Sequence, residues 1–282
     1  MTGEGGASGA TGLVDAFADF VGQVPCREVE LPWGRAQVWD EGKGRPIVLL
    51  HGIAGGRRTF FRLVPLLAAS RRVIVAPLRG EDMPAPRATW EEMLDDIARL
   101  LEALDLKDAT LFGTSFGGAL AMAYGARSDP RVTEIRVQGT FHRLRLRPFD
   151  RTAHLLSYAM PSALGAAYLA RRVRRGPETG FLKAHAPGID ELFPRWCALT
   201  PFPTVRRRIA ILNSLDLSAA VRAIRVPLAF LHGEKDRVVP RVCSEALRLL
   251  RPDAPFTLLE SAGHNLPLTH PPEVAMYATR AS

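Results

Sequence analysis

The stretch LFGTSFGGALAMAYG, residues 111–125, joins a short apolar run to a helical pattern through a turn rich in glycine. Gly113 and Gly117 flank Ser115 in a G-x-S-x-G pentapeptide. Glycine at these two places removes side chains that would clash in a sharp turn between a strand and a helix. The serine hydroxyl then stands at the N-terminus of the helix, where the helix dipole favours negative charge. The stretch predicts either a strained turn that exposes a nucleophilic serine or a plain tight turn.

Apolar segments rich in β-branched residues recur on both sides of this turn. The first two, residues 27–33 and 36–40, are expected to form a hairpin around Gly34. The others cover residues 46–52, 71–78, 109–113, 133–139, 227–233 and 256–263. Several of them are apolar throughout, which is typical of strands covered on both faces and favours a parallel sheet.

A helical pattern lies between two of these segments, over residues 90–104. Thr89 and Glu92 form a capping-box signature at its start. One face of this helix is expected to carry seven apolar residues at 3.6-residue spacing: Trp90, Met93, Leu94, Ile97, Leu100, Leu101 and Leu104. The alternation of strands and helices predicts a mostly parallel, doubly wound α/β sheet with right-handed crossovers.

The strand–helix rhythm breaks over residues 141–208, which are rich in arginine and contain helical pieces and prolines. Long insertions at the carboxyl edge of a sheet usually cover or shape a site. We therefore expect residues 25–140 and 209–282 to form the core, and residues 141–208 to form a helical cap inserted after the sixth strand. Residues 1–24 are expected to be a flexible tail and lead-in.

A serine becomes an effective nucleophile when a base, itself held by an acid, removes its proton. In folds with a G-x-S-x-G turn, the acid follows the serine in the chain and the histidine comes last. Asp236 comes just after the strand segment 227–233, and His264 just after the segment 256–263. Because parallel strands end at the same edge of the sheet, both side chains are expected near Ser115.

Other residues compete for these roles. Asp216 is the rival acid, although we expect it to cap or position the helix before residues 227–233. Glu234 comes too early for the pattern, and His270, at a helix entry, is the weaker candidate for the base. His51 is expected to be structural. A solvated or core role is expected for the three histidines of the insertion, which are His142, His154 and His185.

Four stretches together resemble the α/β-hydrolases: HGIAGG, GTSFGG, HGEKDRVVP and SAGHNLPLTHPPEV. The resemblance covers residues 25–278. It implies the α/β-hydrolase fold and a serine hydrolase without cofactor or metal, in which Ser115 is the nucleophile, His264 the base and Asp236 the orienting acid. It also implies an oxyanion hole formed by the backbone N–H groups of Ile53 and Phe116.

The N-terminal half is also similar to maspardin-like proteins, in FADFVGQVPCREVEL and TWEEMLDDIARLLEALDL. Maspardin is usually treated as a binding or adaptor member of the fold, and it lacks a histidine at the position of His264. The presence of His264 here favours an enzyme over a binding module. The wall of the site near residues 81–88 departs from the pattern of many relatives and stays undefined.

Composition narrows the remaining possibilities. The net charge of +8 comes mainly from arginine, without a nucleic-acid-binding signature, so no nucleic-acid partner is expected. The three cysteines are far apart, which argues against disulfides and zinc. The first twelve residues lack signal-peptide features, and the longest apolar stretch, residues 157–170, is too short to span a bilayer. A cytoplasmic protein is expected.

The favoured activity is hydrolysis of a carboxylic ester with a small or medium acyl chain. Tyr158, Met160 and Leu164 are expected to belong to a lid over the acyl pocket, with plain packing of the cap as the alternative. A second hypothesis is an esterase or thioesterase acting on an acyl group bound to an acidic carrier protein or to coenzyme A. Its docking residues would be the arginines of the insertion: Arg143, Arg145, Arg147, Arg171, Arg172, Arg174 and Arg175.

Overall fold

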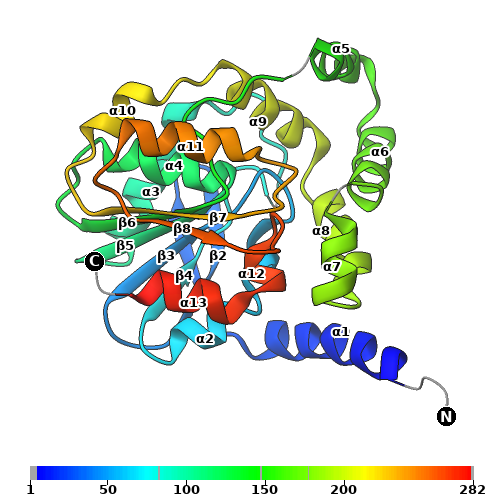
Figure 1. Cartoon of the computed structure of the whole chain (residues 1–282), viewed down its shortest axis with the longest axis horizontal. Helices are drawn as coiled ribbons and strands as arrows, with labels where there is room; N and C mark the ends of the chain where they lie inside the picture. Colours follow the sequence, from blue (N-terminus) through cyan, green and yellow to red (C-terminus); the bar gives the residue numbers. More distant parts are fainter. Residues whose placement is uncertain (1–4, 82, 147, 177, 281–282) are drawn as a thin grey trace.

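The computed structural model describes residues 5–81, 83–146, 148–176 and 178–280. At its centre is an eight-stranded sheet with the strand order β1-β2-β4-β3-β5-β6-β7-β8 (Figure 1). The strands are β1 (Cys26–Leu31), β2 (Gly34–Glu41), β3 (Pro46–Leu50), β4 (Arg72–Val75), β5 (Ala109–Thr114), β6 (Val132–Gln138), β7 (Leu228–Gly233) and β8 (Phe256–Leu259). β2 pairs antiparallel with β1 and β4, and the other pairs are parallel. The predicted fold class is confirmed.

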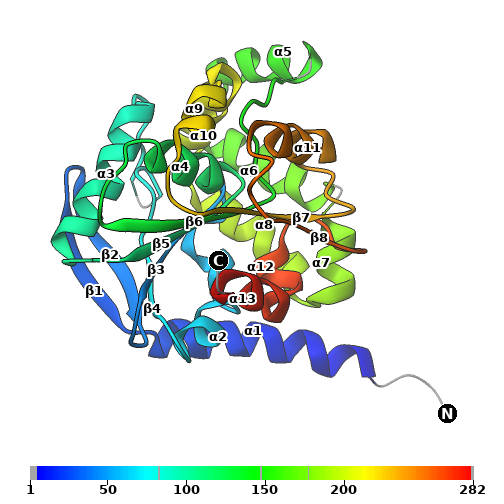
Figure 2. The same cartoon turned by 60° about the vertical axis from the view of Figure 1, so that its left-hand side comes forward.

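Helices cover both faces of the sheet, as a buried parallel sheet requires. One face carries α3 (Trp90–Ala103), α4 (Phe116–Gly125), α10 (Ser218–Ala223) and α11 (Arg241–Leu250) (Figures 1 and 2). The other face carries α2 (Val64–Ala68), α12 (Leu266–Thr269) and α13 (Pro271–Thr279). Two separate apolar clusters result, one on each side of the sheet.

Helix α3 begins as its sequence predicts. The Thr89 side chain accepts a hydrogen bond from the backbone N–H of Glu92 at 3.2 Å, and the Glu92 carboxylate accepts one from the backbone N–H of Thr89 at 2.8 Å. The apolar face is buried at Met93, Leu94 and Ile97, with Leu100 and Leu101 one turn further on. This face packs α3 against β1 and α4.

The segment between β6 and β7 is helical. It contains α5 (Pro148–Leu156), the 3₁₀ turn η2 (Ser157–Ala159), α6 (Ser162–Arg174), α7 (Thr179–His185), α8 (Ile189–Leu199) and α9 (Phe202–Ser214). In both views α5 stands away from the sheet, whereas α9 leads back toward it (Figures 1 and 2). The exact boundaries of the cap stay a prediction, because α9 runs across the expected boundary at residue 208.

The N-terminal segment differs from the expected flexible lead-in. Residues Gly5–Gln23 form helix α1. Phe17 packs against Phe61 and Trp196, and Phe20 packs edge-on against Trp39. The glycines at its start lower intrinsic helix propensity, so these tertiary contacts, which local composition does not reveal, account for the helix.

Among the residues that the structure describes, no helix has both the length and the apolar character needed to cross a bilayer.

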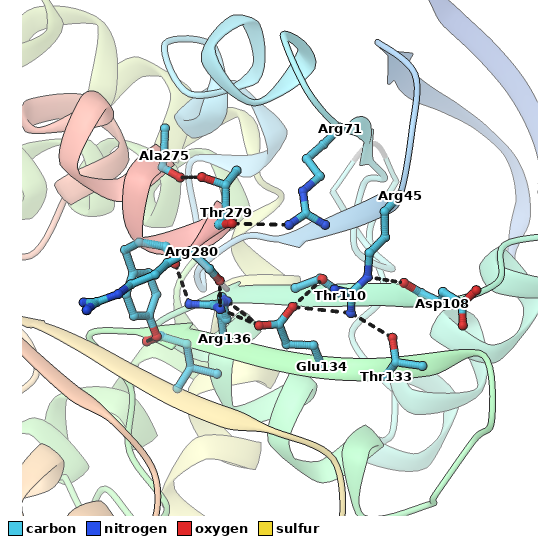
Figure 3. A network of polar contacts seen from close by, with 12 residues as sticks. Arg45, Arg71, Asp108, Thr110, Thr133, Glu134, Arg136, Ala275, Thr279 and Arg280 are labelled. Atoms are coloured by element: carbon cyan, nitrogen blue, oxygen red, sulfur yellow. Dashed lines mark hydrogen bonds and ion pairs between the residues drawn. The ribbon is translucent and has the colours of Figure 1, made fainter. Parts of the chain in front are cut away.

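A buried ionic network lies between the sheet and α13 (Figure 3). The Arg136 guanidinium contacts the Glu134 carboxylate at 2.5 Å and also donates to the backbone carbonyls of Tyr277 and Arg280 at the end of α13. Glu134 in turn accepts a hydrogen bond from the Thr110 hydroxyl on β5 at 3.0 Å. The network therefore ties the last helix to the middle of the sheet by satisfying carbonyls that a helix end leaves free.

Candidate active site

Ser115 occupies a strained turn between β5 and α4. Its backbone has φ 53° and ψ −116°, and it is the N-cap residue of α4. A β-carbon at Gly113 would lie 2.3 Å from the carbonyl oxygen of Gly117, and one at Gly117 would lie 2.1 Å from that of Leu50. Neither contact is possible for real atoms, so the sharp turn requires both glycines of the pentapeptide. A positive φ at a non-glycine residue carries strain that is often found at functional sites.

The residues that follow β6 connect this turn to the loop of His264. The backbone N–H of Ser115 donates to the carbonyl of Gln138 at 2.9 Å, and the hydroxyl of Thr140 donates to the carbonyl of Ser115 at 2.7 Å. The side-chain amide of Gln138 donates to the carbonyl of His264 at 3.0 Å. The three strand ends that carry Ser115, Gln138 and His264 are therefore fixed relative to one another.

Asp236 and His264 form the second part of the site. The Oδ2 atom of Asp236 lies 2.6 Å from Nδ1 of His264. The other carboxylate oxygen accepts the backbone N–H groups of Val238 and Val239 at 2.9 and 2.8 Å. Because both oxygens are engaged, the carboxylate is fixed and sets the orientation of the imidazole ring.

Gly139 lies directly against this pair. A β-carbon at this position would lie 3.1 Å from Oδ2 of Asp236 and 3.2 Å from Nδ1 of His264, and its φ is 53°. Both the limited space and the positive φ favour glycine here. The residue run Gln138–Thr140 thus brings the strand end beside Ser115 into contact with the pair of Asp236 and His264.

The electrostatics of the pair favour a charged imidazolium. Burial acts to lower the pKa of His264, but the charge of Asp236, its hydrogen bond and the charge of Glu178 together raise that pKa above its usual value. Burial acts to raise the pKa of Asp236, yet His264 and the backbone N–H of Val239 lower it overall. The pair therefore stabilises the state in which the histidine has accepted a proton.

The Ser115 and His264 side chains are not hydrogen-bonded to each other in the part of the chain that the structure describes. Such contacts are commonly loose before substrate binds. The expected nucleophile, acid and base nevertheless follow three parallel strands, β5, β7 and β8, of which β7 and β8 are adjacent and β5 is separated from β7 by β6 alone. Their catalytic roles stay a prediction.

The loop after β3 lies beside Ser115. A β-carbon at Gly52 would lie 3.6 Å from Cβ of Ser115. The carbonyl of the next residue, Ile53, accepts a hydrogen bond from the Arg208 guanidinium at 2.9 Å. Phe116 is the first residue of α4, where backbone N–H groups have no partner within the helix. Phe116 thus follows Ser115 directly and Ile53 follows the glycine that lies beside it, and their role as an oxyanion hole stays a prediction.

Buried polar side chains contact the loop after β3. Glu81 lies 2.8 Å from Nε2 of His51, which is fully buried, and accepts the backbone N–H of Arg57 at 3.3 Å. Burial acts to raise the pKa of Glu81, but His51, Arg57 and Arg208 together lower it to about 2. His51 thus has a structural position, as expected from the sequence.

Arg208 and Glu178 are the site residues that sequence reasoning missed. Arg208 is fully buried and donates to the carbonyls of Ile53, Leu78 and Arg79. The sequence does contain an indication that Arg208 is buried, because Arg208 shares a face of α9 with the apolar residues Val205 and Leu212. Glu178, in RRGPETGF, carries no such signal, since nothing local distinguishes it from a solvated carboxylate.

The rival candidates lie elsewhere. Asp216 accepts hydrogen bonds from the backbone N–H and the hydroxyl of Ser218, the first residue of α10, so it positions the start of that helix. Nδ1 of His270 contacts the hydroxyl of Thr269 at 2.8 Å, and His270 precedes α13. Within residues 5–81, 83–146, 148–176 and 178–280, no group of three or more His, Cys, Asp or Glu side chains is arranged to hold a metal ion.

Two of the three expected acyl-pocket residues are exposed. Tyr158 is 53% exposed and stacks against the Arg206 guanidinium at 4.2 Å, and Leu164 is 61% exposed. Met160 is half-buried after η2. Within the described part of the chain, none of these three residues forms a hydrogen bond, ion pair or ring contact with Ser115, so their role stays a prediction. Phe193 of α8 lies closer to the site, because its ring would be 3.2 Å from a β-carbon at Gly55.

The chain is similar to known proteins over most of its length. Residues 47–276 match the model of the Alpha/beta hydrolase family. The chain is 30% identical over 240 residues to a 2-hydroxy-6-oxo-2,4-heptadienoate hydrolase of Pseudomonas putida, covering 80% of this chain and 84% of that protein. It is 28% identical to a pimeloyl-[acyl-carrier protein] methyl ester esterase of Aromatoleum aromaticum, covering 82% and 95%.

Among solved structures, a thermophilic esterase from Thermogutta terrifontis superposes with a TM-score of 0.71 at 25% identity, covering 90% of this chain and 96% of that one. The matched family region includes Ser115, Asp236 and His264. The chain belongs to the alpha/beta hydrolase family.

Proposed function

We propose that the chain is a serine hydrolase that cleaves carboxylic esters of small to medium acyl chain through an acyl-enzyme intermediate. Ser115 is the nucleophile, His264 the general base and Asp236 the orienting acid. Family membership supports hydrolysis, and similarity to esterases supports an ester as the substrate. The observation that carries the proposal is the 2.6 Å contact between Asp236 and His264 at the sheet edge that also holds the strained Ser115.

The proposed roles define the chemistry. His264 removes the hydroxyl proton of Ser115 as the oxygen attacks the acyl carbon, and the backbone N–H groups of Ile53 and Phe116 stabilise the oxyanion that develops. The same imidazolium then protonates the departing alkoxide. In the second half, His264 activates a water molecule, which releases the acid and regenerates Ser115. Asp236 stabilises the imidazolium in both halves.

Two measurements on one preparation test this proposal. The protein is incubated with a fluorophosphonate, which labels activated serines, and the modified peptide is mapped. Hydrolysis of p-nitrophenyl esters from acetyl to dodecanoyl is then followed. We expect labelling at Ser115 and a rate maximum at a short or medium acyl chain. A folded protein that shows neither labelling nor hydrolysis would contradict the proposal and favour the binding-module alternative.

A carrier-bound acyl ester is the second candidate. It is supported by the relative that acts on an acyl-carrier-protein ester and by the exposed arginines Arg171, Arg174 and Arg175 at the end of α6. The other arginines expected to dock a carrier are less suited. Arg143 approaches Asp216, Arg145 donates to the Asn213 carbonyl, Arg172 pairs with Asp150, and Arg147 lies outside the described residues.

Reversing the charge at Arg174 and Arg175 together should separate the two candidates. If a carrier docks there, the KM for an acyl-carrier-protein ester rises about 10-fold, and the effect shrinks at high salt because the attraction is long-range. The KM for a free p-nitrophenyl ester stays unchanged. The matched control is Arg35→Glu, an exposed arginine on β2. Equal changes for both substrates would rule out the carrier candidate.

A further inference from the structure

Glu178 connects the cap to the loop that carries His264. It is the N-cap residue of α7 and is buried. Its Oε2 atom accepts the backbone N–H of His264 at 2.5 Å. A charge-assisted hydrogen bond from a backbone amide to a buried carboxylate is stronger than a neutral one. The contact joins residues 86 positions apart, so it is a tertiary tie between the cap and the base.

The His264 loop passes so close to the cap that only glycine fits beside it. A β-carbon at Gly263 would lie 2.6 Å from Oε2 of Glu178 and 2.9 Å from the Phe181 ring. On the opposite side, a β-carbon at Gly233 would lie 2.1 Å from the carbonyl of Gly263. The His264 loop is therefore closely packed between the end of β7 and the start of α7.

The Glu178 carboxylate also acts electrostatically on both members of the pair. Its charge is one of the causes that raise the pKa of His264. Burial, and then the neighbouring Asp236 charge, raise the pKa of Glu178 above its usual value, against the opposing effects of His264 and of the backbone N–H groups of His264 and Arg237. Glu178 thus faces both the base and the residue that follows the acid.

We propose that Glu178 is a positioning residue through which the cap fixes the His264 loop and supplies a second negative charge that favours the imidazolium. This inference rests on the proposed function. Because Glu178 acts through His264 and its loop, its removal affects the chemical step, whereas a residue of the acyl pocket would affect substrate binding.

Three variants separate the two effects of Glu178. Glu178→Gln keeps an oxygen that accepts the His264 N–H but removes the charge, whereas Glu178→Ala removes both. Glu191→Gln is the matched control, because Glu191 is an exposed carboxylate on the neighbouring α8 of the same cap. The readouts are kcat and KM for the best p-nitrophenyl ester, the rate of fluorophosphonate labelling, and the titration of the His264 imidazole followed by NMR without substrate.

For Glu178→Ala we expect kcat and the labelling rate to fall about 10- to 100-fold with KM changed less than about threefold, as small misplacements of a catalytic group produce. For Glu178→Gln we expect a smaller loss in kcat, and a His264 titration midpoint lower by about 0.5–1 pH unit. The acidic limb of kcat/KM should move to lower pH by the same amount, because the base must be neutral to act. Glu191→Gln should match the wild type.

An unchanged His264 midpoint in Glu178→Gln, or a rise in KM at constant kcat in Glu178→Ala, would overturn the inference. The NMR titration needs no substrate, so it decides the matter even if Glu178→Ala fails to fold. Failure of the proposed function looks different, because the wild type itself would then show neither labelling at Ser115 nor hydrolysis.

Discussion

Replacing Ser115 by alanine is expected to lower kcat/KM for the best p-nitrophenyl ester by about 10⁴- to 10⁶-fold, the loss that removal of a triad nucleophile typically causes. The acyl group then has no acceptor on the protein, and His264 has no hydroxyl to deprotonate. Fluorophosphonate labelling should disappear in the same variant. The matched control is Ser128→Ala, since Ser128 is an exposed serine that also has a positive φ, of 54°. It should keep full activity and labelling.

A second substitution at the same position tests the strain of the turn. Alanine keeps the β-carbon that makes φ 53° and ψ −116° costly, whereas glycine removes it. Relief of about 1–3 kcal/mol of strain should outweigh the entropy cost of glycine, about 0.5–1 kcal/mol. Ser115→Gly is therefore expected to be inactive yet to unfold at a higher urea concentration than Ser115→Ala. The opposite order of stabilities would show that the turn is unstrained, and residual activity in either variant would contradict the role of Ser115.

The sheet could be predicted because its information is local. Every predicted strand segment overlaps one of the strands, from Cys26–Leu31 to Phe256–Leu259. The apolar runs, the capping box at Thr89 and the glycines around Ser115 each follow from the chemistry of a few adjacent residues. Helix α1 was missed for the opposite reason, because Phe17 and Phe20 find their partners in distant segments.

The residues of the candidate site also fall into two groups, those that local sequence predicts and those that only the tertiary structure identifies. Ser115, Asp236 and His264 each follow a strand, so chain order and the rule for parallel strands were enough to place them at one edge. Glu178 and Arg208 lie in the cap, where charged residues are frequent and only the tertiary structure distinguishes a buried one from a solvated one. The sequence predicts Arg136 only as part of a strand, because its partners at the end of α13 lie more than 140 residues away.

Replacing Arg136 by methionine is expected to lower the free energy of unfolding by about 3–5 kcal/mol, the usual cost of breaking a buried ion pair from one side. Methionine is close to arginine in length but cannot donate hydrogen bonds to the Glu134 carboxylate or to the carbonyls at the end of α13. Arg45, whose guanidinium lies 3.4 Å from the Glu134 carboxylate, is a more distant cation. The contact of the guanidinium with the Tyr277 ring, at 5.4 Å, is lost too. Urea unfolding followed by circular dichroism measures the change.

Two further variants show whether burial of the ion pair is the reason for the loss of stability in Arg136→Met. Arg35→Met removes an arginine that is 73% exposed and pairs with Glu28 on the surface, so it should cost less than about 1 kcal/mol. Glu134→Leu combined with Arg136→Met removes both buried charges, and it should be more stable than Arg136→Met alone because no carboxylate is left without its partner. If Arg136→Met cost no more than Arg35→Met, the network would not stabilise the attachment of α13. Because α12 and α13 directly follow His264, a loss of stability there should also loosen the base, so the fluorophosphonate labelling rate of Ser115 should fall in Arg136→Met. It should recover only in part in the double variant, because the carbonyls of Tyr277 and Arg280 still lack the guanidinium.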